Sequence, residues 1–218
     1  MGARVVSVNI GPVVHAGWAG RPRQTAIDKR PVDGPVKVRK LGLAGDAVGD
    51  PRFHGGVHKA VYAYAAEDLR LWEDRLGRPV RPGLFGENLT TVGVDLSETV
   101  LGEHWRVGTA LLSPSEIRTP CNTFRKWLGR EGFDTTGWLR RFIEEGRAGT
   151  YLRVLEEGVV RAGDEVVVDH RPEHGVRVST MFTAFTQDAT LLPRLLAVEG
   201  LPDEVYAAAR KQRYRTHR

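Results

Sequence analysis

Residues 104–128 read HWRVGTALLSPSEIRTPCNTFRKWL, and within them the pattern changes from short β runs to a helix. The runs HWRVG and TALLSPS follow each other directly around glycine, as short strands joined by turns do. Beyond them, Pro120 together with the apolar residues Phe124, Trp127 and Leu128 predicts a helix over 120–128. Strands interrupted by short helices indicate a mainly β fold of the α+β class.

The same alternation of β runs with glycine and proline extends in both directions from this stretch. Further strands are expected in RVVSVNI, VKVRKL, KAVYAYA, ENLTTVG, TYLRVLE and DEVVVDH. Such closely spaced runs predict a β-barrel or sandwich-like domain over residues 1–172. Helices are expected within it at 66–76, which Gly77 would end, and at 138–145, which Gly146 would end.

The periodicity becomes helical after residues 170–175. Apolar residues recur there at i, i+3, i+4 and i+7, namely Val178, Met181, Phe182 and Phe185. Two more helices are expected, at 189–198 and at 202–211. Three short helices alone would be marginally stable, so residues 176–212 are predicted to form a small three-helix bundle that packs on the barrel. The final segment, 213–218, is a basic tail.

Composition limits the classes of function. The chain has 218 residues, a formal net charge of +5 and one cysteine. One cysteine cannot form an intrachain disulfide or supply the four thiolates of an iron–sulfur cluster. No segment approaches the roughly 20 apolar residues that span a membrane, so we expect a cytoplasmic protein without membrane contact. The charge favours anionic ligands but does not establish nucleic-acid binding, which we do not expect. A homo-oligomer is compatible with this composition.

The cysteine occupies a position where a thiol becomes reactive. In the segment Arg118-Thr119-Pro120-Cys121, Thr119 is a suitable N-cap and Pro120 suits the first helical position. Cys121 is then expected in the first turn, where the helix dipole and unpaired N–H groups favour the thiolate, and Arg118 adds to this effect. A thiolate is a nucleophile or a soft-metal ligand. A buried apolar cysteine without chemistry fits the local sequence equally well.

A glycine-rich stretch carries the next candidates. Residues 42–46, GLAGD, and 53–60, FHGGVHKA, combine glycines with Asp46, His54 and Lys59. Glycines permit close backbone approach, so N–H groups beside Lys59 could receive an anion. The glycine spacing matches neither a P-loop nor a dinucleotide fingerprint.

Two weaker patterns accompany this stretch. His54 and His58 have the spacing of zinc ligands on a helix, but Gly55 and Gly56 between them argue against a helix, and histidines satisfied in a turn remain the simpler interpretation. A second turn, PGLFGENL at 82–89, brings Glu87 and Asn88, which could bind a heterocycle or their own backbone. There is no G-x-S-x-G elbow to support a serine hydrolase.

Five segments in order resemble the MOSC family, the C-terminal domain of molybdenum cofactor sulfurases, and specifically its stand-alone bacterial YiiM-like branch. They are GLAGD (42–46), HGG with KAVYAY (54–64), GENLTTVG (86–93), GTALLSPSEIRTPC (108–121) and GRAGTYLRVLEEGVVRAGD (146–164). The three C-terminal helices are similar to that branch's appendage. The resemblance implies a MOSC-type β-barrel with inserted helices.

The resemblance also implies roles for individual residues. Cys121 would be the molybdenum ligand or a persulfide carrier, with Arg118 beside it as a second catalytic residue. The cofactor-binding residues would be Asp46, His54, Gly55, Gly56, Lys59, Glu87, Asn88 and Arg118. Ile117 and Asn122 depart from the family pattern, where proline and a basic or aromatic residue are common, and this affects the expected substrate preference.

The function implied is a molybdenum-cofactor-dependent reductase of N-hydroxylated compounds, for example N-hydroxylated purine bases. A soft thiolate suits molybdenum, and the missing dinucleotide fingerprint predicts that electrons come from a separate reductase. Two alternatives remain open. Cys121 could carry persulfide sulfur to an acceptor, or the chain could bind the molybdenum cofactor without turnover.

Overall fold

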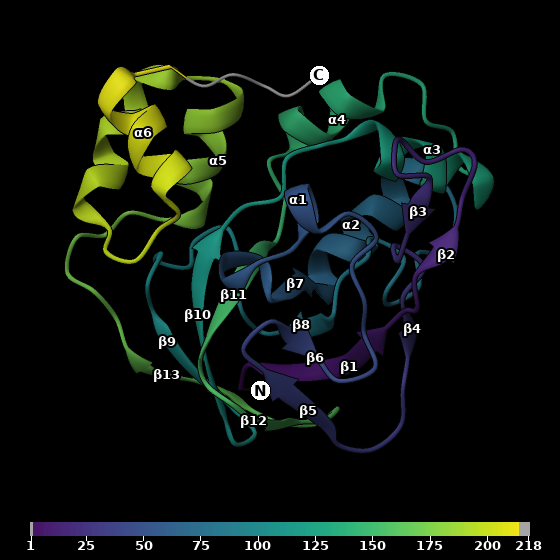
Figure 1. Ribbon diagram of the computed structural model, residues 1–218, viewed down its shortest axis with the longest axis horizontal. Coiled ribbons are helices and arrows are strands. Elements are labelled where there is room, and N and C mark those ends of the chain that lie inside the picture. Colours follow the sequence, from purple (N-terminus) through teal and green to yellow (C-terminus); the bar gives the residue numbers. More distant parts are fainter. Residues whose placement is uncertain (1, 214–218) are drawn as a thin grey trace.

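A computed structural model describes residues 2–213, and its centre is a curled sheet of eight strands (Figure 1). In spatial order the strands are β13 (Val166–His170), β9 (His104–Val107), β10 (Ala110–Glu116), β11 (Thr150–Glu156), β7 (Val61–Ala65), β8 (Leu89–Val92), β1 (Arg4–Ile10) and β4 (Arg30–Pro31). Neighbouring strands run antiparallel except β7 and β8, which are parallel because helix α2 (Ala66–Leu76) crosses between them.

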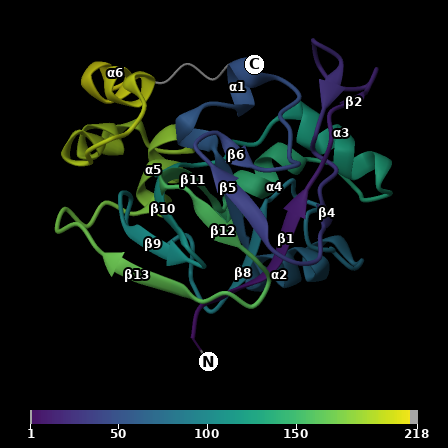
Figure 2. The same ribbon diagram turned by 60° about the horizontal axis from the view of Figure 1, so that its bottom comes forward.

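The curl brings the two ends of this sheet together. Arg4 of β1 forms an isolated bridge with Glu165, and the Val166 N–H donates to the Ala3 carbonyl at 2.9 Å. Figure 2 shows β1, β8 and β13 around the same interior. The sheet is thus a half-barrel, and the predicted α+β barrel fold is confirmed.

Two smaller groups of paired strands accompany the half-barrel. One group is β12 (Gly158–Val160), β5 (Val36–Arg39) and β6 (Gly42–Leu43), and the other is the hairpin of β2 (Val14–His15) with β3 (Gln24–Thr25). Most of these strands have two or three residues, too few to show a period in the sequence. Two short turns of helix, α1 (Pro51–His54) and η1 (Val57–Lys59), escaped prediction for the same reason.

Successive side chains of a strand point to opposite faces of the sheet, and those that point into the half-barrel are mainly apolar. In β11, every second residue from Thr150 to Val154 is buried, and in β5 Val36 and Val38 are buried while their neighbours are exposed. This core includes Val5, Val8, Leu89 and Leu112 from other strands. The period of two explains why these longer strands could be predicted.

A second, aromatic core lies between the sheet and three helices. These are α2, α3 (Asn122–Arg130) and α4 (Trp138–Glu145). Trp72 of α2 packs 4.8 Å from Trp138, and Phe124 of α3 packs 5.9 Å from Phe142, between ring centres. Gly77 and Gly146 end α2 and α4 in the left-handed conformation, as expected.

The three C-terminal helices gather on one side of the molecule, drawn in yellow-green in Figure 1. They are α5 (Val178–Thr186), η2 (Ala189–Ala197) and α6 (Asp203–Lys211). Phe182 of α5 lies 6.3 Å from Phe142, so the bundle shares the aromatic core with the main domain. The expected packing is confirmed. The division into a barrel of 1–172 and an appendage of 176–212 as separate units stays a prediction.

Two details of this bundle differ from expectation. The predicted helix at 189–198 is a 3₁₀ helix, because Pro193 inside it supplies no backbone N–H for an α-helical hydrogen bond. The last helix begins at Asp203, with Pro202 as its N-cap rather than its first residue. Apart from Arg213, the expected basic tail of 213–218 lies outside the described residues.

Candidate functional site

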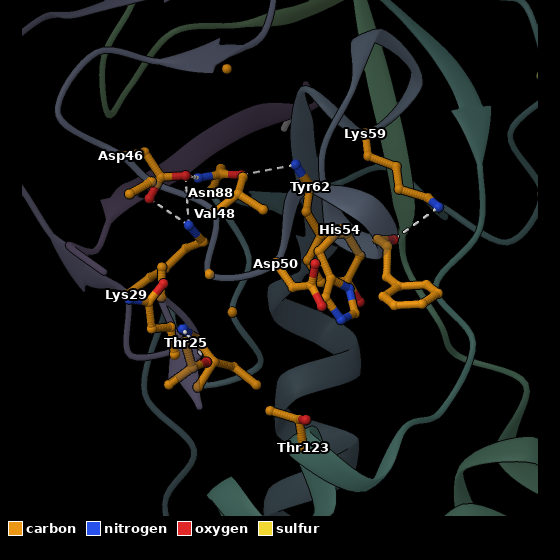
Figure 3. Close-up of a pocket in the computed structure, with 18 of the residues that line it drawn as sticks. Thr25, Lys29, Asp46, Val48, Asp50, His54, Lys59, Tyr62, Asn88 and Thr123 are labelled. Carbon is orange, nitrogen blue, oxygen red and sulfur yellow. Dashed lines mark hydrogen bonds and ion pairs between the residues drawn. The ribbon is translucent and has the colours of Figure 1, made fainter. Parts of the chain in front are cut away.

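A cavity of about 450 Å³ opens between the β2–β3 hairpin, the β5–β6 turn, the segment 46–60 and the start of α3. Six of the predicted site residues line it: Asp46, His54, Lys59, Asn88, Arg118 and Cys121. Figure 3 shows four of them, Asp46, His54, Lys59 and Asn88, around the pocket. The segment 46–59 and Cys121 therefore line one cavity, while the roles of these residues stay predictions.

Cys121 is the N-cap of α3 rather than a residue of its first turn. The helix begins at Asn122, and Cys121 has extended backbone angles (φ −135°, ψ 159°). Its Sγ accepts the Phe124 N–H at 3.4 Å, which satisfies one of the free N–H groups at the helix start. The expectation of Thr119 as N-cap was wrong because the thiol itself takes that position. The half-buried sulfur still lies beside free helix N–H groups and lines the cavity.

Arg118 is a buried cation fixed by aromatic rings. Its guanidinium lies over Phe124 at 4.0 Å and over Tyr62 at 5.2 Å from the ring centres, and it donates to the Phe85 carbonyl. Only 8% of the residue is exposed. No carboxylate in the described part of the chain forms an ion pair with it. A buried charge without a counter-ion is costly, so this position favours an anion in the adjacent cavity.

Lys29 is a second buried cation of the cavity, and the sequence analysis missed it. Its Nζ donates to both carboxylate oxygens of Asp46, with 2.6 Å to Oδ2. Burial lowers the pKa of Lys29, although Asp46 opposes this change. The segment TAIDKRPV around Lys29 has no glycine cluster or spacing that would have marked it.

Asp46 and Asn88 belong to a hydrogen-bond network that joins several segments (Figure 3). Asp46 accepts from the Gly11 N–H at 2.9 Å and from Asn88 Nδ2 at 2.8 Å. Asn88 Oδ1 accepts from the Tyr62 N–H at 3.0 Å. Both side chains therefore hold the cavity wall together, and their remaining hydrogen-bonding capacity for a ligand is small.

The segment carrying His54 and Lys59 is tied to the barrel. Asp50 caps α1 through the Arg52 N–H, and Lys59 Nζ donates to the Phe53 carbonyl at 3.2 Å and pairs with Glu116 at 3.1 Å. His54 stands in the cavity, accessible to solvent but surrounded by protein atoms. Desolvation, helped by the positive charges of Arg118 and Lys59, lowers the pKa of His54 to about 4. The imidazole is therefore neutral at neutral pH.

Three predicted binding residues do not line the cavity. Gly55 and Gly56 connect α1 to η1, and Gly56 has a φ of 99° that favours glycine. Glu87 points into the turn before it, where it accepts from the N–H groups of Gly83 at 2.5 Å and Phe85 at 3.1 Å. This turn presents the Phe85 carbonyl to Arg118. Glu87 therefore lies behind the cavity wall, and its role in cofactor binding stays a prediction.

Two tyrosines from neighbouring strands complete the cavity wall. Tyr62 of β7 and Tyr151 of β11 pack with ring centres 4.8 Å apart, and the Tyr62 hydroxyl donates to the Ala148 carbonyl at 2.6 Å. Burial raises the pKa of Tyr151 to about 12 and raises that of Tyr62 further. Both stay neutral and give the cavity an aromatic wall suited to a planar ring. Their strand sequence, KAVYAYA for Tyr62, resembled core sequence and did not mark them.

The zinc interpretation of His54 and His58 finds no ligand set. Among residues 2–213 there is no group of three or more histidine, cysteine or acidic side chains placed to hold a metal ion. His58 turns away from the cavity toward Arg153 and the acidic start of α6, and burial lowers its pKa. No helix in the described chain is both long and apolar enough to cross a membrane.

Comparison with known proteins places this geometry in a family. The MOSC domain profile matches residues 50–167, which include Lys59, Arg118 and Cys121. The Bacillus subtilis (strain 168) protein YflK is 32% identical over 214 residues, which cover 97% of this chain and 95% of YflK. A Gibberella moniliformis protein named Reductase is 33% identical over 168 residues, which cover 73% of this chain but 28% of that protein.

A solved structure agrees with the sequence relatives. The crystal structure of YiiM from Geobacillus stearothermophilus has a TM-score of 0.79 and 28% identity, and the alignment covers 96% of this chain and 98% of that one. The matched fold, the profile over more than half of the chain and the full-length relative YflK lead to one conclusion: this chain belongs to the MOSC domain family.

Proposed function

We propose that this chain is a reductase of N-hydroxylated compounds that binds a molybdenum cofactor in the cavity of Cys121. One observation carries the proposal: a thiol at a helix N-terminus meets, in one cavity, a buried arginine that forms no ion pair with a carboxylate of residues 2–213. The family supports a connection with the cofactor, since MOSC domains also form the C-terminal part of molybdenum cofactor sulfurases. The name of the fungal relative supports reduction.

The residues present fit such a cofactor. A thiolate is a soft ligand that suits molybdenum, and Cys121 is the one thiol of the chain. The cofactor's pterin carries a phosphate, and Arg118 brings positive charge to the cavity, while Lys29 and Lys59 in its wall are paired with Asp46 and Glu116. The aromatic wall of Tyr62 and Tyr151 suits a planar ring system. A volume of about 450 Å³ lies within the range of small-molecule sites.

Three side chains of the cavity would have different roles in the reaction. Cys121 would hold the metal, and Arg118 would stabilise the thiolate and an anionic group of the cofactor. Neutral His54 can donate or accept one hydrogen bond to a neutral substrate without attracting a competing anion. When bound, the molybdenum centre supplies an open coordination position and exchanges electrons.

The overall reaction determines how many electrons and protons the site must receive. An N-hydroxylated compound R–NH–OH takes up two electrons and two protons, the N–O bond breaks, and R–NH₂ and water form. One proton ends on nitrogen and the other on the departing oxygen. The protons come from solvent through the open cavity, and the electrons come from a separate donor protein.

The test compares the wild type with Cys121→Ser, both purified from a host that makes the cofactor. We expect about one molybdenum per wild-type chain and reduction of an N-hydroxylated purine with reduced methyl viologen. The serine variant should lose both, because a hydroxyl ionises far less readily than a thiol. Asn122→Ala, a neighbouring exposed change, is the matched control for metal content and should retain it.

The other outcomes identify the alternatives. Metal-free wild type that carries one labile sulfur on Cys121 would favour sulfur transfer. Metal-loaded wild type without turnover would favour a binding module. A serine variant with full molybdenum content would show that the ligand assignment is wrong.

A further inference from the structure

We propose that the mouth of the cavity is the docking surface for a small acidic one-electron carrier protein, which delivers electrons to the site and excludes substrate while it is bound. The inference rests on the proposed function and names the partner of that site. It is carried by the charge and the exposure of four residues at the mouth: Arg21, Arg39, Leu41 and Phe53.

Two arginines reach the mouth from different segments. Arg21 lies in the loop between β2 and β3, and Arg39 is the last residue of β5. Both are exposed, and neither forms an ion pair with a carboxylate within residues 2–213. Guanidinium groups that the fold does not use are available to carboxylates of a partner.

The carboxylates of the same cavity do not neutralise this surface. Asp46 is paired with Lys29, and Asp50 is paired with Arg52 at 2.9 Å. Lys59 is paired with Glu116 at 3.1 Å, whereas Arg118, which forms no ion pair with a carboxylate of residues 2–213, adds positive charge deeper in the cavity. The opening is therefore positive overall, which attracts an acidic protein and raises its association rate at low salt.

Apolar side chains stand between these charges. Leu41 is 66% exposed and Phe53 is 49% exposed, and both line the mouth. Large apolar side chains that remain exposed beside free arginines resemble the centre of a small interface with a charged rim. Such an interface suits brief encounters with an electron carrier better than a permanent complex.

The chemistry requires a partner of this kind. Each turnover needs two electrons, and the described residues contain no ligand group for a relay metal. The electrons must therefore reach the site from a donor outside these residues.

Docking at the mouth has a kinetic consequence. Cys121 lines the cavity that opens there, so a protein covering Arg21 and Arg39 also covers the route by which substrate enters. Donor and substrate must then bind in turn. Rates measured against both concentrations should give the parallel double-reciprocal lines of a ping-pong mechanism.

The experiment uses cofactor-loaded protein and the double variant Arg21→Glu/Arg39→Glu. The matched control is Arg70→Glu/Arg194→Glu, which makes the same change in net charge at two exposed arginines outside the cavity, on α2 and η2. Electron donors are reduced flavodoxin or a reduced [2Fe–2S] ferredoxin, both acidic, and reduced methyl viologen as the small donor.

We expect the mouth variant to lower kcat/KM for the protein donor at least about tenfold at low ionic strength, with the difference shrinking as salt screens the charges. The control should change by less than about twofold, and viologen-driven turnover should not fall in either variant. Equal losses in both variants would mean that only net charge matters and would overturn the proposal.

Three further results would also overturn it. A mouth variant that loses molybdenum or viologen-driven turnover would show that Arg21 and Arg39 bind cofactor or substrate. Intersecting kinetic lines would exclude alternate binding at the mouth. Wild type that turns over with viologen but with neither protein donor would exclude an acidic carrier. Wild type inactive with viologen refutes the proposed function instead, so the two failures are distinguishable.

Discussion

The guanidinium of Arg118 lies 4.0 Å from the centre of the Phe124 ring, so the first buried residue of α3 holds a cation against the helix that Cys121 caps. Phe124 has two roles in this arrangement. Its N–H donates to the sulfur of Cys121, and its ring carries the charge of Arg118. The spacing of R-x-P-C-x-x-F therefore fixes the thiol and the cation together.

Replacing Arg118 should reduce cofactor binding while changing the stability of the fold only slightly. Arg118→Met removes a buried charge that has no carboxylate partner in the described part of the chain, and this gain offsets the lost hydrogen bond to Phe85. We expect the cofactor-free protein to lose no more than about 1 kcal/mol of unfolding free energy. Molybdenum content should fall at least about tenfold. A large loss of stability with full metal content would contradict this account of Arg118.

The capping role of Cys121 gives a second prediction. Serine is a better N-cap than cysteine, so Cys121→Ser should stabilise the cofactor-free protein by about 0.5 kcal/mol, measured by denaturant unfolding. Cys121→Val has no acceptor and should destabilise it by about 1 kcal/mol. If serine and valine have the same effect on stability, the hydrogen bond from Phe124 to the sulfur contributes nothing.

The parts of the fold that could be predicted are those with a repeating pattern. In strand β11 every second residue from Thr150 to Val154 is buried, and α2 has apolar spacing and a terminal glycine. The exact start of α3 could not be predicted, because Thr119 and Cys121 can both cap a helix and only packing selects between them. Glu87 was misplaced for a similar reason, since its sequence does not show that the Gly83 turn closes around it.

The candidate site was predictable where chemistry leaves a local mark. Cys121, Arg118 and Lys59 lie in short segments with unusual composition. Lys29 does not, because its importance comes from long-range contact with Asp46, 17 residues away. Tyr62 and Tyr151 meet only because β7 and β11 pair in the sheet. Contacts between distant segments leave no periodic signal in one sequence.

His54 should report the charge of the cavity. Its pKa is lowered from 6.5 to about 4 by desolvation, with Arg118 and Lys59 adding to the effect. NMR titration of its ring protons should therefore find a value near 4, and Arg118→Met should raise it because one positive neighbour is gone. A value near 6.5 in the wild type would contradict the described surroundings of the ring.

The same shift makes stability depend on pH in a defined direction. The folded pKa lies below the unfolded value, so the unfolded chain binds the extra proton between pH 6.5 and about 4. The contribution of neutral His54 to the free energy of unfolding is fully present above pH 6.5, and it is lost as the pH falls from 6.5 to about 4. His54→Asn should flatten this part of the curve, measured by denaturant unfolding at a series of pH values.

The pair of Lys29 and Asp46 should behave as one unit. Both side chains are more than nine-tenths buried, so Lys29→Met would leave the Asp46 carboxylate without its cation and should cost about 3 kcal/mol of unfolding free energy. Asp46→Asn should be costly as well, because Lys29 then loses its counter-ion. The double variant Lys29→Met/Asp46→Asn leaves neither charge unpaired, while asparagine can still accept from the Gly11 N–H. Its cost should therefore fall short of the sum of the single costs by about 2 kcal/mol.

Arg52 and Asp50 provide the contrast for this double-mutant cycle. They form an ion pair at the edge of the same cavity, but the Arg52 side chain is 67% exposed. Arg52→Met should leave the free energy of unfolding nearly unchanged, because water replaces the lost contact. Denaturant unfolding of all variants at one pH measures both comparisons. Additive costs for Lys29 and Asp46 would mean that the two side chains stabilise the cavity wall independently, through their other contacts. The buried ion pair would then not be what joins the segment before β4 to the segment at Asp46.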